Sequence, residues 1–363
     1  MSTTYLLART ARTALATLVI SASVAAATRE VPQDYDTIQE AVTAAQSGDV
    51  ILIDKGEFAE AVTVEKKSNL TIRGMGKKTR LKKGAGSSTS IDVIDSSDIT
   101  IESIRFSDAQ RSIETSFGTR IRIRKCVMDG LIGVDAAGTT EIEVFDCTFN
   151  TVSEGVLVIG SGKGSAIVGC RFLDPGTGFL TGVRVFSSSA SQITVADNKF
   201  VGCSTGALLD SGVAILDCEF VACVTGARFG AGSEVTVAGN SFKKCGTAIL
   251  CPTVASSGVI DDNAVKGGNA GIDLDQVSGF LVTRNQVKKT QGDAIRVRAN
   301  ATESLFSKNK AVKAGASGFH VEGVGNSLHG NAAKKSAGFD LNDETSDGDN
   351  AYSLNKFPTI APS

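Results

Sequence analysis

The feature that most constrains this chain is an internal repeat of about 22 residues. A short alternating strand ends in Asn or Cys, and an apolar residue follows two positions later. This marker recurs at steps of 20 to 28 residues, at Cys126, Cys147, Cys170, Asn198, Cys218, Asn240, Asn263, Asn285, Asn309, Asn331 and Asn355. Shortly after the marker, Gly or Ala opens another alternating strand, as in Gly182-Val-Arg-Val and Gly318-Phe-His-Val.

Such a period, with three short strands per repeat and no helical spacing, predicts an all-β parallel solenoid. Each repeat would form one coil, and coils stacked about 4.8 Å apart would build a rod of roughly 11–12 coils. Equivalent residues then lie directly above one another. We therefore expect the Asn column to form a ladder of hydrogen-bonded amides. We also expect each Asn to take the left-handed backbone of a tight bend.

The start of the chain has the pattern of an export signal. Arg9 and Arg12 precede an apolar run over residues 13–24, and Ala25-Ala26-Ala27 forms an A-x-A cleavage site. We predict a signal peptide over residues 1–27; the alternative is an amphipathic helix that the mature protein retains. The run of about 12 residues is too short for a membrane anchor. No later stretch reaches 18 uncharged apolar residues, so we expect a mature chain without a transmembrane segment, secreted or held in the periplasm or at the cell surface.

Beyond the repeat, the sequence resembles the right-handed parallel β-helix proteins of the pectin-lyase-like superfamily, over essentially the whole mature chain. The most specific part is residues 31–53, followed by Gly56-Glu-Phe and Leu70-Thr-Ile-Arg-Gly74, which resemble the capping segment and first coils of that superfamily. The resemblance implies a right-handed parallel β-helix with an N-terminal capping helix. We expect one domain over residues 28–363, with caps at residues 28–56 and 340–363.

The residues of the expected cap support a helix independently of the resemblance. Thr37 and Glu40 have the spacing of a capping box. One apolar helical face then comprises Ile38, Ala41, Val42 and Ala45. Such a helix can cover the open end of a solenoid, which would otherwise expose strand edges.

Composition excludes several classes of function. The 363 residues contain no Trp, three Tyr and two His, which argues against aromatic sugar-stacking platforms and multi-histidine metal sites. The formal net charge of −2 gives no reason to expect nucleic acid as a partner. The eight cysteines fall largely into two columns of the repeat, so we expect buried free thiols that act as small hydrophobes. One or two disulfides between neighbouring coils are the alternative, because the coil spacing lies within disulfide range.

Charged residues gather on the strand after the Gly in the last four coils. Taking Val183, Ile272, Ile295, Phe319 and Phe339 as inward, alternation directs a set of polar side chains outward. The candidate catalytic residues in this set are Asp273, Asp275, Arg296, Arg298, His320 and Glu322.

Two chemistries fit this cluster. In a lyase, Asp273 and Asp275 would hold Ca²⁺ against a uronate carboxylate, while Arg296, Arg298 or His320 would abstract the proton alpha to it. In a glycoside hydrolase, the carboxylates would act as general acid and base. The simpler interpretation is ordinary sheet stabilisation, because the charges alternate in sign from coil to coil.

A basic row follows the bend Asn in five consecutive coils. The functional interpretation is that an acidic polysaccharide lies along the rod and binds these lysines. The alternative is a set of solvated residues that only guard against aggregation. The candidate substrate-binding residues are Lys243, Lys266, Lys288, Lys313, Lys334, Asp340 and Asn342.

The signatures of known enzymes of this fold are missing from the groove strand. Asp261-Asp262 falls at the bend, and His329-Gly330 precedes a bend Asn. We therefore favour a secreted, non-catalytic protein that binds carbohydrate or serves as a surface scaffold. The alternative is a polysaccharide lyase or glycoside hydrolase that acts on an acidic, uronate-containing polysaccharide. No cofactor is certain, and Ca²⁺ belongs to the lyase hypothesis alone.

Overall fold

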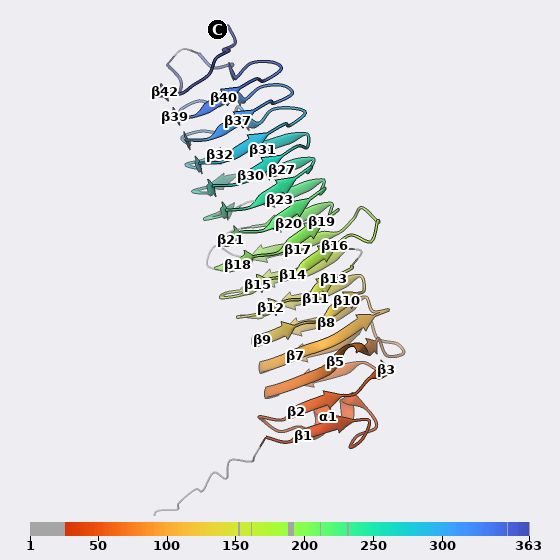
Figure 1. The fold of residues 1–363 in the computed structure, drawn as a ribbon. Helices are drawn as coiled ribbons and strands as arrows, with labels where there is room; N and C mark the ends of the chain where they lie inside the picture. The colour runs from red at the N-terminus through yellow and green to blue at the C-terminus, as the bar shows by residue number, and fades with distance from the viewer. Residues whose placement is uncertain are drawn as a thin grey trace, which may run out of the picture.

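The chain forms a long parallel β-solenoid with β1 at one end of the rod and β42 at the other (Figure 1). The structure is a computed structural model that describes residues 26–362, apart from 152, 161, 188–191, 211, 231 and 347. Most of the predicted signal peptide therefore lies outside the described residues. No helix in this part of the chain is long and apolar enough to cross a membrane.

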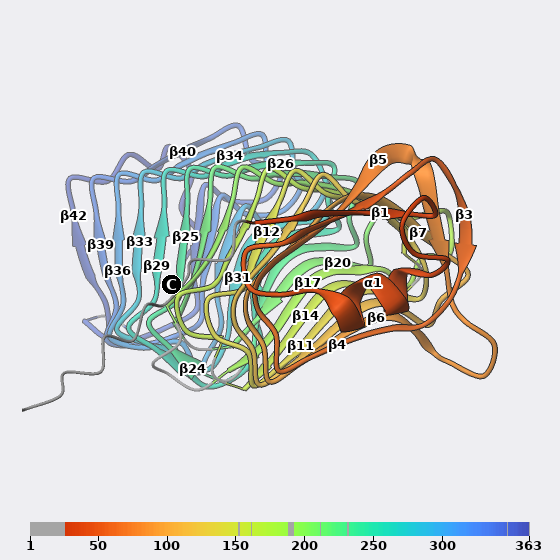
Figure 2. The ribbon, with the colours of Figure 1, turned by 90° about the horizontal axis from the view of Figure 1, so that it is seen from below.

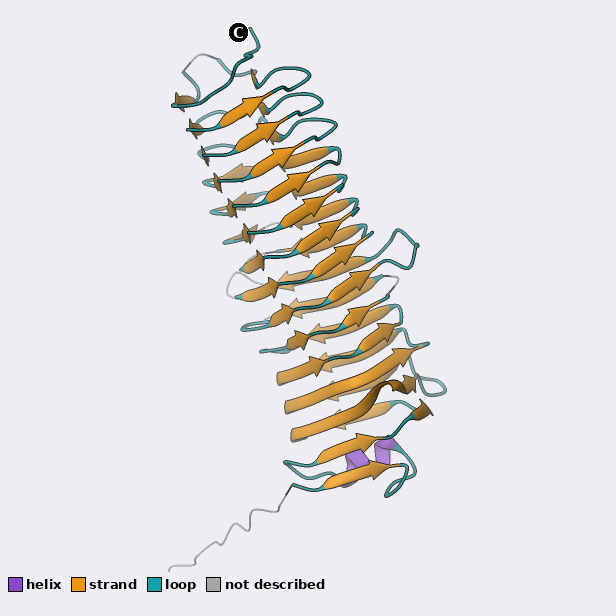
Figure 3. Ribbon diagram, in the orientation of Figure 1, coloured by secondary structure: helices purple, strands orange, loops and turns teal. Residues whose placement is uncertain are grey.

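Each coil contributes strands to the walls of the rod, joined by bends and loops (Figure 3). Every strand pairs in parallel with its equivalent in the next coil, as the repeat predicted; β27, β31, β35 and β38 pair in this order, for example. Within the described residues, the second sheet holds 13 strands, one per coil, and so extends beyond the 11–12 coils predicted. The additional coil lies at the N-terminal end, where β5 is a 15-residue strand with two register shifts and carries no Asn or Cys marker.

The first sheet comprises 26 strands in the described residues, with two stacks along most of the rod. Its strands are β1 (Thr28–Val31), β2 (Val50–Ile53), β3 (Gly56–Ala59), β5 (Ser68–Lys82), β7 (Ser97–Ser107), β9 (Thr119–Arg124), β10 (Val127–Asp129), β12 (Glu143–Phe145), β13 (Thr148–Phe149), β15 (Ala166–Val168), β16 (Arg171–Leu173), β18 (Ile193–Ala196), β19 (Lys199–Val201), β21 (Val213–Leu216), β22 (Glu219–Val221), β25 (Thr236–Ala238), β26 (Ser241–Lys243), β29 (Val259–Asp261), β30 (Ala264–Lys266), β33 (Leu281–Thr283), β34 (Gln286–Lys288), β36 (Leu305–Ser307), β37 (Lys310–Val312), β39 (Ser327–His329), β40 (Ala332–Lys334) and β42 (Ala351–Ser353).

The second sheet carries the strand that follows the Gly of each repeat. Its strands are β4 (Val62–Glu65), β6 (Thr89–Ile94), β8 (Arg111–Ser116), β11 (Ile132–Ala137), β14 (Glu154–Gly160), β17 (Thr181–Ser187), β20 (Thr205–Leu209), β23 (Thr225–Phe229), β27 (Thr247–Cys251), β31 (Ala270–Leu274), β35 (Ile295–Val297), β38 (Phe319–Val321) and β41 (Leu341–Asp343). A short third sheet consists of β24 (Gly232–Ser233), β28 (Ala255–Ser256) and β32 (Val277–Ser278).

The predicted capping helix is present as α1 (Ile38–Ala44), which lies across the first coil when the rod is seen from below (Figure 2). The Thr37 side chain accepts a hydrogen bond from the backbone N–H of Glu40, and the Glu40 carboxylate accepts one from the backbone N–H of Thr37. Ile38, Ala41 and Val42 are buried against the end of the solenoid. This helix covers the apolar interior that the first coil would otherwise expose.

The bend Asn column forms the predicted amide ladder. Asn263 donates to Asn285 over 2.9 Å, and Asn285 donates to Asn309 over 3.0 Å. The expected left-handed backbone is wrong for the Asn itself, since it belongs to the preceding residue, such as Asp262 or Arg284. With the bend formed one residue earlier, the Asn side chain can turn inward and bond the next coil.

Apolar residues two positions after the marker fill the interior as a stack of aromatic rings. Phe149, Phe172, Phe200, Phe220 and Phe242 lie ring over ring, with centroids 4.6–4.8 Å apart. All eight cysteines are free and buried, as we expected from their columns. Burial raises the pKa of the Cys218 thiol to about 12, which keeps it protonated and unreactive.

Candidate functional site

The second sheet places the predicted catalytic residues on its outer face near the C-terminal end. Asp273 of β31 pairs with Arg296 of β35, which pairs with His320 of β38, so these three side chains form one column. Asp275, Arg298 and Glu322 follow two positions later in the same coils. The structure thus brings all six residues onto one surface.

Asp273 is bound by a guanidinium group rather than open to a metal ion. Arg298 donates from Nε and Nη2 to the two carboxylate oxygens of Asp273 over 2.7 and 2.8 Å. This bond raises the pKa of Arg298, which therefore stays protonated and cannot serve as a base. Asp275 accepts a hydrogen bond from Asn300 over 3.2 Å. A Ca²⁺ ion between Asp273 and Asp275 would have to displace Arg298.

The other members of the cluster are also paired. Arg296 donates from Nη2 to Oε1 of Glu322 over 2.6 Å. His320 contacts Asp293 through Nδ1 at 3.0 Å and Glu344 through Nε2 at 2.8 Å. Burial lowers the pKa of His320, but the hydrogen bonds to Asp293 and Glu344 outweigh it, so the net shift is upward. The cluster is a network in which each base is paired with at least one acid.

A depression of about 420 Å³ lies beside this network. It is lined by Asn269, Ala270, Asp273, Gln291, Gly292, Asp293, Arg296 and Arg298. The only carboxylates among the lining residues, Asp273 and Asp293, are already bound to Arg298 and His320. The depression can take a polar ligand, but it offers no unpaired general acid and base.

The prediction for the last coil is wrong by two residues. Phe339 is 38% exposed and does not point inward; Leu341 instead pairs with Phe319. Asn342, and not Asp340, is therefore the neighbour of His320 on the outer face. Asp340 is 2% exposed and accepts a hydrogen bond from the Thr359 hydroxyl at 2.9 Å, so it is unavailable to a ligand.

Sequence reasoning missed Asp293 and Glu344, which hold the two nitrogen atoms of His320. The corrected alternation of the last coil would have placed Glu344 two positions after Asn342, beside Glu322. Asp293 precedes its strand at a bend, where alternation carries no information.

A second charged column, also missed, occupies the early coils of the second sheet. Asp92, Glu114 and Asp135 are consecutive partners on β6, β8 and β11. Arg111 donates from Nε to Asp135 over 2.7 Å. Burial, followed by repulsion from Glu114, raises the pKa of Asp92. The same alternation rule that gave Asp273 and Arg296 would have found this column.

The predicted lysine row is two rows. Lys243, Lys266 and Lys288 are successive partners at the ends of β26, β30 and β34, and this row continues at Val312 and Lys334. Lys313 belongs instead to a neighbouring row at the bend. The bend row also contains Lys244, Lys289 and Lys335, all with a left-handed backbone. We call these eight residues the lysine face: Lys243, Lys244, Lys266, Lys288, Lys289, Lys313, Lys334 and Lys335.

The lysine face is exposed and largely without counter-charges. All eight lysines are exposed. Of these eight lysines, only Lys243 lies within salt-bridge distance of a carboxylate in the described residues, that of Glu219 at 2.5 Å. The positive charge of this face is therefore available to a ligand.

Exposed phenylalanines modify the expectation that stacking platforms are scarce. Phe117 is 73% exposed and Phe179 is 78% exposed. The sequence argument against stacking platforms rested on the scarcity of Trp and Tyr and left Phe out. Phe117 lies over Gly138, where a Cβ atom would be 3.1 Å from the ring. Phe186, further along the rod, is 42% exposed and has the Arg184 guanidinium 5.0 Å from its ring centroid.

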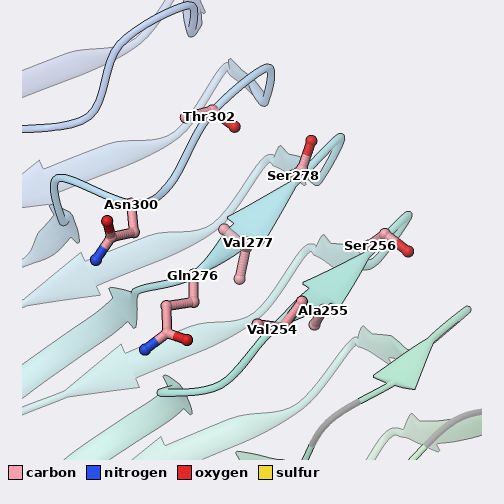
Figure 4. A pocket seen from close by; sticks show the side chains of 8 residues that line it. All are labelled: Val254, Ala255, Ser256, Gln276, Val277, Ser278, Asn300 and Thr302. Atoms are coloured by element: carbon pink, nitrogen blue, oxygen red, sulfur yellow. The ribbon is translucent and has the colours of Figure 1, made fainter.

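A depression of about 410 Å³ lies over the third sheet, near the charged cluster in sequence (Figure 4). The amides of Gln276 and Asn300 lie on one side of it, and the hydroxyls of Ser256, Ser278 and Thr302 on the other. It has no titratable lining residue and so offers no acid or base for catalysis.

Comparison with known proteins decides the family. The family model described as "Right handed beta helix region" matches residues 59–215 and 181–333, which together span most of the chain. The chain belongs to the right-handed β-helix family. No curated protein matches this β-helix.

Solved structures share the fold of this β-helix at low identity. The catalytic unit of a GH87 alpha-1,3-glucanase from Streptomyces thermodiastaticus matches with a TM-score of 0.60 and 12% identity, over 90% of this chain and 66% of the glucanase chain. A PL6 polysaccharide lyase from Pseudopedobacter saltans matches with a TM-score of 0.56 and 14% identity, over 92% of each chain. A mannuronic acid specific family 6 lyase from human gut microbiota matches with a TM-score of 0.59 and 13% identity, over 93% and 92%. At such identities the likeness shows the fold, and activity is a separate question.

Proposed function

We propose that this β-helix is a non-catalytic, extracytoplasmic protein that binds an acidic, uronate-rich polysaccharide along the lysine face. The observation that carries the proposal is the double row of exposed lysines with almost no carboxylate partners. Stacked like charges repel one another, so an anionic polymer would relieve a strain built into five coils. Lys313, Lys334 and the other lysines of the face would contact the polymer, while Asp340 is buried and has no part in it.

The spacing of the lysines favours a polymer over a small anion. Lysines in register on β26, β30 and β34 repeat at the sheet spacing of about 4.8 Å, which extends positive charge along the rod axis. Each contact can be weak, because several neighbouring contacts act on one chain and raise the overall affinity. A neutral glucan would gain nothing from this charge.

The ion pairs of the C-terminal cluster support a non-catalytic protein. Asp273, Arg296 and His320 each have a bound partner of opposite charge. The competing function is a polysaccharide lyase or glycoside hydrolase that uses this cluster, and the lyases among the structural neighbours favour it. It requires the substrate to break these pairs on binding.

Binding and cleavage can be tested in one series. Titration calorimetry with polygalacturonate, polymannuronate and a neutral glucan should show affinity for the two uronates, which weakens as salt screens the lysines. The variant Lys266→Glu/Lys288→Glu should lose at least tenfold in affinity. The matched control, Lys77→Glu/Lys78→Glu, changes two exposed lysines on β5 and should bind as the wild type does. Equal binding by both variants would remove the lysine face from the proposal.

The same polymers, incubated with and without Ca²⁺, should yield neither unsaturated products nor new reducing ends. Product formation that is lost in Asp273→Ala/Arg296→Ala would instead establish the lyase or hydrolase. The circular dichroism spectrum and unfolding midpoint of each variant would separate a loss of function from a loss of fold.

A further inference from the structure

We propose that His320, Glu322 and Glu344 bind one divalent transition-metal ion, for which Zn²⁺ is the best match. Each residue offers one ligand atom, and these atoms all lie within 4.8 Å of one another. The three residues come from β38, the position just after it, and the equivalent position of the following coil. This inference is independent of the proposed polysaccharide binding.

The distances are close to those of a coordination shell. Zinc binds nitrogen and oxygen at about 2.0–2.2 Å, so two ligands of a tetrahedral site are about 3.3 Å apart. Nε2 of His320 lies 3.4 Å from Oε1 of Glu322 and 2.8 Å from Oε1 of Glu344. Of these two distances, the shorter has to open by about half an ångström to admit the ion. The glutamate oxygens lie within 4.8 Å of each other and can close on the ion from there. Glu344 can make this adjustment because its side chain is 55% exposed.

Each ligand is already oriented by a neighbour. Asp293 holds Nδ1 of His320 at 3.0 Å, which directs Nε2 towards the two glutamates. Such a carboxylate–histidine pair is the usual outer support of a metal-bound imidazole. Asn342 donates to Glu344 over 3.0 Å, and Arg296 donates to Glu322 over 2.6 Å. The side chain of His320 is only 15% exposed, so the ring is fixed by packing as well.

The local charge also favours a divalent ion. Three carboxylates, those of Asp293, Glu322 and Glu344, surround His320, and among the described residues Arg296 is the one other cation bound to this group. Even with a protonated imidazole, the group carries a net charge of −1. A divalent ion bound to the neutral imidazole would bring the group to neutrality.

The ligand set distinguishes among ions. Imidazole nitrogen with two carboxylates suits Zn²⁺ and its neighbours, whereas Ca²⁺ takes six to eight oxygen ligands. Three protein ligands leave a fourth position for water or for an oxygen of a bound molecule. This site differs from the Ca²⁺ pair considered from the sequence, since Asp273 is bound to Arg298 and lies outside it.

The experiment uses the purified protein without a histidine tag. Equilibrium dialysis with Zn²⁺ should show one ion per chain, and Ca²⁺ should not compete at equal concentration. With only two histidines in the sequence, NMR can follow each imidazole separately. Added Zn²⁺ should shift the resonances of His320 and leave those of His329 unchanged, because His329 contacts Ser353 on β42 and has no part in the cluster.

Variants complete the test. His320→Ala should abolish binding, and Glu344→Gln should weaken it at least tenfold. His329→Ala, the matched control, should bind as the wild type does. Glu344 is exposed, so its variant should fold even if His320→Ala does not. The proposal fails if the wild type binds no Zn²⁺, if Ca²⁺ displaces it at equal concentration, if His329 rather than His320 responds, or if folded Glu344→Gln binds unchanged.

Discussion

At the scale of single residues, the glycine that is the second residue of several strands in the second sheet lies against a phenylalanine ring of the next coil. A Cβ atom at Gly206 would come within 2.5 Å of the Phe220 ring, and the same holds at Gly155 and Gly182 with their own rings. Ala248 occupies the equivalent position in a later coil, where the stack has changed from Phe to Val265. Gly271, one coil further, is kept against Val287, where a Cβ atom would also lie 2.2 Å from the Ala294 carbonyl oxygen. Both the stacked side chain and the neighbouring backbone therefore decide which residue fits.

Gly206→Ala should consequently destabilise the protein by about 1–3 kcal/mol, because the added methyl group overpacks the core. Chemical denaturation would measure the change in the free energy of unfolding. In a Phe220→Val background the same substitution should cost less, since the ring is gone and only the contact with the Gly226 carbonyl oxygen, 2.7 Å from the Cβ position, remains. Additive effects of the two substitutions would show that the ring does not set the cost.

At the scale of strands, Glu219 links three consecutive coils of the first sheet. Its carboxylate contacts Lys199 at 2.7 Å on β19 and Lys243 at 2.5 Å on β26, while Glu219 itself begins β22. These hydrogen bonds lower the pKa of Glu219 to about 2. The ionised form of the Glu219 carboxylate is therefore more stable, relative to the protonated form, in the folded state than in the unfolded state.

Glu219→Gln should lower stability at neutral pH by no more than about 1 kcal/mol, because the side chain is partly exposed. The contribution is complete above the unfolded pKa of about 4.3 and is lost as the pH falls from there towards 2. Unfolding midpoints of the wild type and variant should thus differ at pH 7 and converge near pH 2. A difference that persists at pH 2 would mean that packing, and not charge, is responsible. Glu65→Gln, whose partner Lys66 is its sequence neighbour, should have no comparable effect.

The strands also show where sequence reasoning succeeds and fails. Alternation placed Asp273, Arg296 and His320 in one column because each coil there repeats the same inward residues. It failed at the last coil because Asp340 finds its buried partner in Thr359, 19 residues later. A contact of this kind leaves no periodic signal in the sequence. The repeat therefore could not predict that Leu341, and not Phe339, would be the inward residue of the last coil. Asp293, which binds His320, precedes its strand and was equally hidden from periodicity.

At the scale of the whole molecule, the rod combines an apolar interior with two outer surfaces of different character. The C-terminal end of the second sheet is a network of ion pairs, while the lysine face on the first sheet carries unpaired charge. Both follow from one property of the solenoid: residues one period apart become neighbours, so a repeated charge becomes a row. The period is visible in the sequence, whereas the pairing across each row depends on side-chain reach and on the exact length of every bend.

The buried cysteines can report on how tightly the interior of the rod is packed along much of its length. All eight are buried and free, and they extend from Cys126 to Cys251 through the interior of successive coils. Burial raises the pKa of the Cys218 thiol to about 12. Hydrogen bonding to Cys203 is the largest cause that raises the pKa of Cys223, also to about 12. A thiol reagent at pH 8 should therefore label none of them in the native protein and all eight in denaturant without reductant. Fewer than eight labelled thiols in denaturant would indicate the disulfides that the sequence left open. Partial labelling at low denaturant concentration would show instead that single coils open before the rod unfolds, as nearest-neighbour stabilisation in a solenoid allows.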